Sequence, residues 1–237
     1  MTSSEAKREL HKYASTERKK SNEWFFKTKP GQYGHGDVFI GVSMPDLRKV
    51  AKQYTSLPLA EVAKLLSSKI HEERMLALVI LSYQFAKSDS RGQSQIYHFY
   101  LSNTEHINNW DLVDVVVNKI VGAYLWEHAE AERDILYAYA TSKNMWERRI
   151  AIVATSYFIY QNDFKDTLKI AEMLLHDEEE LIHKAVGWML REVGKRDRAV
   201  EGSFLKKHYK SMPRTMLRYS IEKFPERERQ AFLKGLV

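Results

Sequence analysis

The stretch 183-HKAVGWMLREV-193 shows the pattern that decides the fold class. Its apolar residues recur at spacings of three and four, which is typical of the buried face of an α-helix. Similar stretches stand at 73-ERMLALVILSY-83, 148-RRIAIVATSYF-158 and 217-LRYSIEKF-224, and each carries a cation near its start. No alternating strand pattern lasts anywhere between them. The sequence therefore predicts an all-α protein.

These helical stretches also repeat. Their starts can be set in register on four cations, Arg74, Arg149, Lys184 and Arg218, with the segment around Asp111 filling the first gap. The separations are then about 35 to 40 residues, the period of HEAT and armadillo repeats. We therefore expect a HEAT-like helical-repeat solenoid. Stacked repeats would align equivalent residues along one concave groove.

The region before Pro58 differs from the repeats. We expect capping helices over about residues 1–28, a glycine-rich loop at 30–41, and repeats over about 43–235, all within one domain spanning 1–237. The loop, 30-PGQYGHGDVFIG-41, is either a turn between helices or a place where backbone N–H groups approach an anion. After it, Ser43 and Asp46 resemble a capping box at a helix start.

Composition limits the classes of protein. Hydrophobic residues make up 44% and charged residues 29% of the chain, which are globular values. There is no signal-like segment and no run near the roughly 18 apolar residues of a membrane span, so we expect a cytoplasmic protein. Zero cysteines exclude disulfides and thiol nucleophiles. Scattered histidines and missing nucleotide or zinc motifs predict no metal and no organic cofactor.

The net charge of +6 suggests a polyanionic partner. One face of the 183–195 helix carries Lys184, Trp188, Arg191 and Lys195 opposite the apolar stripe. Such a face is typical of a nucleic-acid surface, although Trp188 could instead pack against the next repeat. Further cations stand in neighbouring repeats: Arg148, Arg149, Arg196, Arg198, Arg214 and Arg218.

A second informative stretch is 108-NNWDLVDVVVNKIVGAY-124. Its apolar spacing predicts a buried helix face, with Trp110 and Asp114 together on one flank and Asp111 capping the first turn. A carboxylate in a basic groove weakens phosphate binding. It makes sense where positive charge develops, as when a glycosidic bond breaks. The alternative for Asp114 is a structural ion pair or cap.

Four segments carry a family resemblance: 29-KPGQYGHGDVFIGVSMPDLRKVAK-52, 109-NWDLVD-114, 146-WERRIAI-152 and 183-HKAVGWMLRE-192. Together they resemble the AlkD-like family of DNA alkylation repair glycosylases. The resemblance implies a HEAT-like solenoid whose concave face binds duplex DNA. It also implies hydrolysis of the N-glycosidic bond of cationic N3- and N7-alkylated purines, such as 3-methyladenine and 7-methylguanine, without a cofactor.

The same resemblance assigns roles to residues. Asp114 matches the family's catalytic aspartate, and Trp110 and Trp188 match two indoles that contact the damaged nucleotide's sugar. Three further residues match DNA-contacting or DNA-adjacent positions: Arg149, Tyr33 and Arg48. One departure is Ser43–Met44, which stands where some active members carry Gln–Thr. This departure leaves the substrate range open.

The expected partner is therefore double-stranded DNA containing alkylated purines, bound by a monomer that is cytoplasmic and associated with the nucleoid. Two other functions remain open from the sequence. One is a non-excising relative that binds unusual DNA structures. The other is a HEAT-like scaffold for acidic proteins.

Overall fold

The structure is a computed structural model that describes residues 1–128 and 132–237. In these ranges the regular elements are helices, and the one bridge of β type joins Val38 to Ile70. The all-α prediction is confirmed. No helix in these ranges has the length and apolar character needed to cross a membrane.

By its contacts the chain divides into two compact units, Met1–Ile120 and Val121–Val237. The expectation of a single domain stays a prediction, and each unit is described by itself. The helices of the first unit are α1 (Ser3–His11), α2 (Thr16–Phe25), α3 (Met44–Gln53), α4 (Leu59–Leu66), α5 (His71–Phe85), α6 (Ser90–Leu101), η1 (Thr104–His106) and α7 (Trp110–Asp114).

A π-helical turn, η2 (Asn118–Gly122), contains the division between the units. The helices of the second unit are α8 (Ala123–Glu127), α9 (Asp134–Ala140), α10 (Met145–Ala154), α11 (Ser156–Tyr160), α12 (Lys165–Met173), α13 (Glu180–Arg196), α14 (Arg198–His208), α15 (Arg214–Ser220), η3 (Ile221–Lys223) and α16 (Glu226–Lys234).

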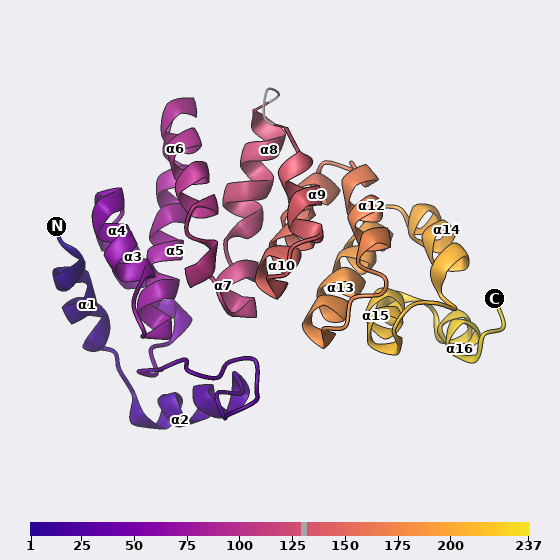
Figure 1. Cartoon of the computed structure of the whole chain (residues 1–237), viewed down its shortest axis with the longest axis horizontal. Helices are drawn as coiled ribbons and strands as arrows, with labels where there is room; N and C mark the ends of the chain where they lie inside the picture. Colours follow the sequence, from indigo (N-terminus) through magenta and orange to yellow (C-terminus); the bar gives the residue numbers. More distant parts are fainter. Residues whose placement is uncertain (129–131) are drawn as a thin grey trace. The chain divides into compact units, whose positions relative to one another are not determined.

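Helices that follow one another in the chain pack side by side within each unit (Figure 1). In the first unit α3 and α4 pack on α5. In the second, α9 packs on α10, and α14 and α15 pack on α13. Short loops join these neighbours, as in stacked helical repeats. The predicted helical-repeat fold is therefore confirmed.

The repeat is clearest where α5 begins. Ser68 Oγ accepts the N–H of Ile70 at 3.0 Å and donates to the carboxylate of Glu73 at 2.6 Å. The Arg74 guanidinium donates back to the Ser68 carbonyl at 3.0 Å. These bonds satisfy polar groups of the loop and lock the chain into the first helical turn.

The start of α10 has the same arrangement, about two repeat lengths further along the chain. Ser142 Oγ accepts the N–H of Asn144 at 3.0 Å and donates to Glu147 at 2.6 Å. Arg148 donates to the Ser142 carbonyl at 2.9 Å. The structural equivalent of Arg74 is therefore Arg148. The register predicted from the sequence, which used Arg149, is wrong by one residue.

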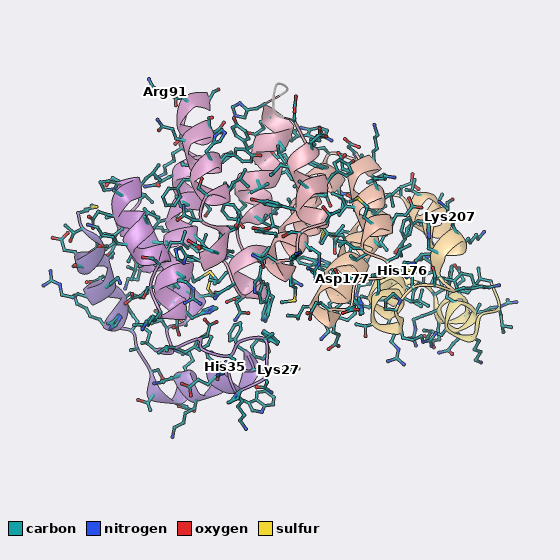
Figure 2. All side chains as sticks on the ribbon, in the orientation of Figure 1. Lys27, His35, Arg91, His176, Asp177 and Lys207 are labelled. Carbon is teal, nitrogen blue, oxygen red and sulfur yellow. The ribbon has the colours of Figure 1, made fainter. Side chains whose placement is uncertain are left out.

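A third, partial copy precedes α13. Asp177 Oδ1 accepts the N–H of Glu179 at 2.9 Å, and His183 Nε2 donates to the Asp177 carbonyl at 2.5 Å. Asp177 lies in the loop that leads into this helix (Figure 2). The three helix starts therefore share one geometry, although the third uses histidine in place of arginine.

In the N-terminal region, where capping helices were expected, the chain forms α1 and α2, and Ser15 caps the second. One other predicted helix is broken. The stretch predicted as one helix from Trp110 to Tyr124 is divided into α7, the π-turn and α8. Its predicted apolar face is nevertheless buried, because Val113, Val116 and Ile120 are each 0% exposed.

Helices α13 and α15 approach closely at Gly187. A Cβ added there would lie 2.5 Å from the Met216 carbonyl oxygen and 2.5 Å from Tyr219 Cβ. Both distances are far shorter than van der Waals contact, and the oxygen belongs to a helix backbone that cannot turn aside. A glycine is therefore needed for this packing.

We expect Gly187→Ala to lower the free energy of unfolding by about 1–3 kcal/mol, because the added methyl forces α13 and α15 apart. Gly202→Ala on α14 is the matched control. A Cβ there meets nothing within 4 Å, so its stability should rise by roughly 0.5–1 kcal/mol. Urea unfolding followed by circular dichroism measures both. Equal stability of Gly187→Ala and the wild type would contradict the close approach.

Candidate functional site

Trp110, the first residue of α7, lies half-buried among aromatic side chains. Its ring stacks on Phe26 with centroids 5.3 Å apart and planes at 21°, and Phe25 meets it edge-on at 5.8 Å. Its Nε1–H donates to the Tyr33 hydroxyl at 3.2 Å. The structure therefore brings together two residues of the predicted site, Trp110 and Tyr33.

The aromatic stack continues inward from Trp110. Phe26 stacks on Phe39 at 5.0 Å, and Phe39 stacks on the imidazole of His71 at 4.5 Å. Phe26 and Phe39 are both buried. Offset stacking of this kind contributes energy beyond the burial of area and fixes ring orientation. The indole is therefore the outer end of a stack whose inner end is a histidine.

That histidine is the centre of a buried polar cluster. His71 Nε2 donates to Asp111 Oδ2 at 2.8 Å, and His71 Nδ1 donates to Asp37 Oδ2 at 3.1 Å. Asp37 also pairs with Arg74 and accepts from Asn109 Nδ2 at 2.9 Å. The cluster links the glycine-rich loop to α5 and α7.

The expectation that Asp111 simply caps the first turn is therefore corrected. The cap of α7 is Asn109, whose Oδ1 accepts the N–H of Trp110 at 2.8 Å. Asp111 uses one oxygen on the N–H of Leu112 and the other on His71. A long-range charge partner, absent from any local pattern, decides the orientation of this carboxylate.

The cluster shifts the pKa values of its members. Burial alone would lower the pKa of His71, but Asp111 and Asp37 outweigh burial and raise it to about 9. Burial alone would raise the pKa of Asp37, but His71, Arg74 and Asn109 outweigh it and lower it to about 2. At neutral pH the cluster therefore holds an imidazolium between two carboxylates.

The glycine-rich loop does approach an anion, and that anion belongs to the chain. The buried carboxylate of Glu72 accepts the backbone N–H groups of Ile40 at 3.0 Å, Gly41 at 2.8 Å and Val42 at 3.4 Å. Gly41 has a positive φ of 81°, and a Cβ there would lie 2.1 Å from the Ser15 carbonyl oxygen. Both alternatives hold in part: the loop is a turn whose amides bind an internal carboxylate.

Sequence reasoning missed the run 71-HEER-74. These four charged or titratable residues are buried, and each is 4% exposed or less. A signal was present in α5, which is apolar on nearly every side after Arg74 and is buried along most of its length. A helix of that kind carries its polar residues into the interior as well.

Asp114 is the last residue of α7 and is half-buried. It is not free, because it interacts with other parts of the chain.

Arg48 is exposed on α3. Burial and the positive charge of Arg48 both lower the pKa of Lys119. The two cations therefore repel each other electrostatically. Lys119 was not singled out from the sequence.

In the second unit, the predicted cationic face of α13 is mostly paired with acids. Trp188 Nε1 donates to Glu192 at 3.2 Å, and the same carboxylate accepts from Lys195 at 2.7 Å. Arg191 pairs with Glu222. Lys184 pairs with Glu180 at 3.0 Å. Trp188 is half-buried, so its indole is neither fully packed inside the protein nor fully exposed to solvent.

Arg148 and Arg149 are both engaged in structural contacts. Arg148 pairs with Asp177 at 2.6 Å, in addition to its bond to the Ser142 carbonyl. Arg149 is only 5% exposed and donates to the Leu181 carbonyl at 2.6 Å. DNA binding by these arginines stays a prediction, and the Asp177 ion pair of Arg148 counts against it.

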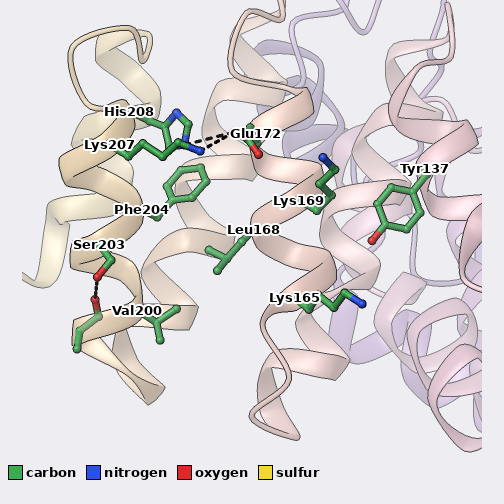
Figure 3. Close-up of a pocket in the computed structure, with 11 residues that line it drawn as sticks. Tyr137, Lys165, Leu168, Lys169, Glu172, Val200, Ser203, Phe204, Lys207 and His208 are labelled. Carbon is green, nitrogen blue, oxygen red and sulfur yellow. Dashed lines mark hydrogen bonds and ion pairs between the residues drawn. The ribbon is translucent and has the colours of Figure 1, made fainter.

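A separate cavity of about 840 Å³ lies in the second unit between α12 and α14 (Figure 3). Leu168 and Phe204 form part of its wall, and Glu172 pairs with Lys207 at its rim at 3.0 Å. None of the predicted site residues lines it. This cavity is therefore distinct from the residues singled out in the sequence.

Comparison with known proteins finds one family by sequence profile and a similar fold among solved structures. The profile of the family described as "DNA alkylation repair enzyme" matches residues 6–224. A solved structure, a predicted DNA alkylation repair enzyme from Enterococcus faecalis, superposes with a TM-score of 0.70 at 17% identity. That match covers 90% of this chain and 97% of the other. No curated protein sequence matches the chain.

The buried cluster makes stability depend on pH. His71 binds its proton more tightly in the folded state, so its contribution is complete below pH 6.5 and is lost as pH rises through about 9. We expect a loss of about 3 kcal/mol in the free energy of unfolding over that range. The contribution of Asp37 to the free energy of unfolding is present above pH 3.8 and is lost as pH falls through about 2.

Urea unfolding at a series of pH values between 6 and 10 measures the alkaline loss. The His71→Gln variant should be less stable at pH 6 and should show a flatter dependence on pH. A fall of the same size in this variant and in the wild type would assign the pH dependence to other groups.

Proposed function

Because the chain belongs to the DNA alkylation repair enzyme family, we propose that it is a DNA glycosylase acting on alkylated purines in duplex DNA. Its substrates would be cationic N3- and N7-alkylated purines, such as 3-methyladenine and 7-methylguanine. The observation that carries the proposal is the half-buried Trp110, fixed by Phe26 and Tyr33 at the start of the short helix that ends at Asp114.

Departure of the alkylated base requires little catalytic assistance from the protein. Alkylation at N3 or N7 leaves the purine positively charged, so it departs as a neutral base when the bond to C1′ of deoxyribose breaks. The positive charge then passes to the sugar, and water adds at C1′ and loses a proton. In this proposal the Asp114 carboxylate stabilises the sugar cation and orients the water. The face of the Trp110 indole contacts the sugar, and Trp188 stays a candidate for DNA contact.

Cations of both units would contact DNA phosphates. Arg48 and Lys119 in the first unit are the best candidates, because their mutual repulsion is relieved when an anion binds. Arg149, Lys184, Arg191 and Lys195 in the second unit are further candidates. The acidic partners of Lys184, Arg191 and Lys195 would have to exchange for phosphates. We propose that the protein acts as a cytoplasmic, nucleoid-associated monomer without a cofactor.

A non-excising DNA-binding relative is the second candidate function. The observation that favours it is the engagement of Asp114 within the chain. A carboxylate used structurally would leave DNA binding intact and give no base release.

We expect release of 7-methylguanine or 3-methyladenine from methylated duplex DNA, measured by chromatography under single-turnover conditions. Asp114→Asn should lower the rate by about 10²–10³-fold, because the charge that stabilises the sugar cation is lost. Its DNA affinity should stay close to that of the wild type. Asp134→Asn, at an exposed aspartate of α9, is the matched control and should leave the rate unchanged.

Two outcomes would count against the proposal. An unchanged rate in Asp114→Asn would remove that residue from its role. Salt-dependent binding of DNA by the wild type, with no base release from any alkylated substrate, would support the non-excising relative instead.

A further inference from the structure

We propose that His71 is a positioning residue for the Trp110 indole: as an imidazolium bonded to Asp37 and Asp111, it fixes the start of α7 against the glycine-rich loop. No signal in the sequence assigned a function to this histidine. Its effect on base excision rests on the proposed function, whereas its effect on Trp110 does not. The charged state of the His71 ring follows from its hydrogen bonds.

Both ring nitrogens of His71 face carboxylate oxygens. Nε2 lies 2.8 Å from Asp111 Oδ2, and Nδ1 lies 3.1 Å from Asp37 Oδ2. Ionised carboxylates only accept hydrogen bonds, and a neutral imidazole has one N–H. Two such partners are satisfied together only when both nitrogens carry hydrogen. With both aspartates ionised, this geometry therefore requires the charged ring.

The charges of the cluster balance in that state. Two carboxylates, Asp37 and Asp111, stand against two cations, His71 and Arg74. Asp37 and Asp111 are only 7% and 14% exposed at the side chain, so water compensates a lost partner only in part. Loss of the imidazolium proton would leave one of the two carboxylate oxygens facing a ring nitrogen that no longer donates, which is unfavourable in a buried cluster.

The cluster holds the backbone on both sides of Trp110. Asp111, the following residue, is bonded to His71. Asn109, the preceding residue, donates to Asp37 at 2.9 Å and caps α7 through the Trp110 N–H at 2.8 Å. Because both neighbours are tied to the same charged cluster, the position of the indole follows the state of His71.

The ring of Trp110 is coupled to His71 by a second route. The stack from Trp110 through Phe26 and Phe39 ends on the imidazole face, and Phe26 also lies 5.1 Å from it. An aromatic face attracts a cation, so the charged imidazole also strengthens this stack. Backbone and ring contacts therefore act in the same direction.

Other titratable groups surround the cluster. Glu72 on α5 is turned to the loop amides and to Asn22 of α2. A cavity of about 310 Å³ borders Asp37 and Arg74, and its wall carries four more groups: His35, Lys69, Glu105 and His106. Tyr33 accepts the indole N–H itself. Any test must separate His71 from these groups.

The test is the indole N–H signal of Trp110 in a ¹H–¹⁵N spectrum of the full chain, assigned with Trp110→Phe. We expect this signal to move with pH, with a midpoint near 9. The titration should vanish in His71→Gln and persist in the control His176→Gln, at an exposed histidine of the second unit. It should also persist in Tyr33→Phe, which removes the hydroxyl that accepts the indole N–H.

Asp111→Asn is the second variant, in case His71→Gln does not fold. It leaves the imidazolium paired with Asp37 and weakens only the link to α7, so it should displace the same signal at pH 7. An indole signal that is identical in the wild type and in folded Asp111→Asn would overturn the proposal. So would an unchanged titration in His71→Gln.

Base release gives the functional arm. His71→Gln should lower the single-turnover rate by about 10- to 100-fold while DNA affinity changes little, because misplacing a contacting group slows chemistry more than binding. Adding Asp111→Asn to His71→Gln should restore part of the rate by neutralising the stranded carboxylate. An unchanged rate beside a displaced indole would overturn the role in excision. No release by the wild type would refute the proposed function, while the spectrum would still decide the role of His71.

Discussion

The first unit depends on a run of four ionisable side chains, 71–74, buried at the start of α5. A buried charge without a partner costs several kcal/mol, so each side chain needs a partner from another segment. His71 reaches the loop and α7, and Glu72 the loop amides. Glu73 pairs with Lys7 of α1 at 2.7 Å. The segments on every side of α5 are thereby held by charge as well as by apolar packing.

Part of this arrangement of polar side chains at a helix start recurs in the second unit. The bonds around Ser142 at the start of α10 repeat those around Ser68, and Arg148 reaches an aspartate outside its helix just as Arg74 does. What α10 lacks is a bridging histidine, because Met145 stands at its first position where α5 has His71. The repeat therefore conserves a helix start, and the first unit adds to it the link that reaches Trp110.

Apolar spacing predicted the helices, the repeat and the buried face of 113–121, because burial of apolar residues is what periodicity reports. The spacing of Ser43 and Asp46 predicted the cap at Ser43, which depends on neighbours three residues apart. Apolar spacing missed the burial of 71–74, because the long-range partners of these residues stand 30 to 66 residues away in the chain. The predicted repeat register was wrong by one residue at Arg149, because Arg148 and Arg149 both fit the pattern of a cation near the helix start. Of the candidate site, the structure pairs Trp110 with Tyr33 in the first unit and links Trp188 to Lys195 through Glu192 in the second.

The carboxylate of Glu72 has a consequence for any encounter with a polyanion. Glycine-rich segments that bind phosphate through their amides often become ordered only when the ligand arrives. Here the amides of 40–42 are already saturated by an internal group. The conformational entropy of this loop is therefore lost during folding, not during association, and the surface that it supports is preorganised.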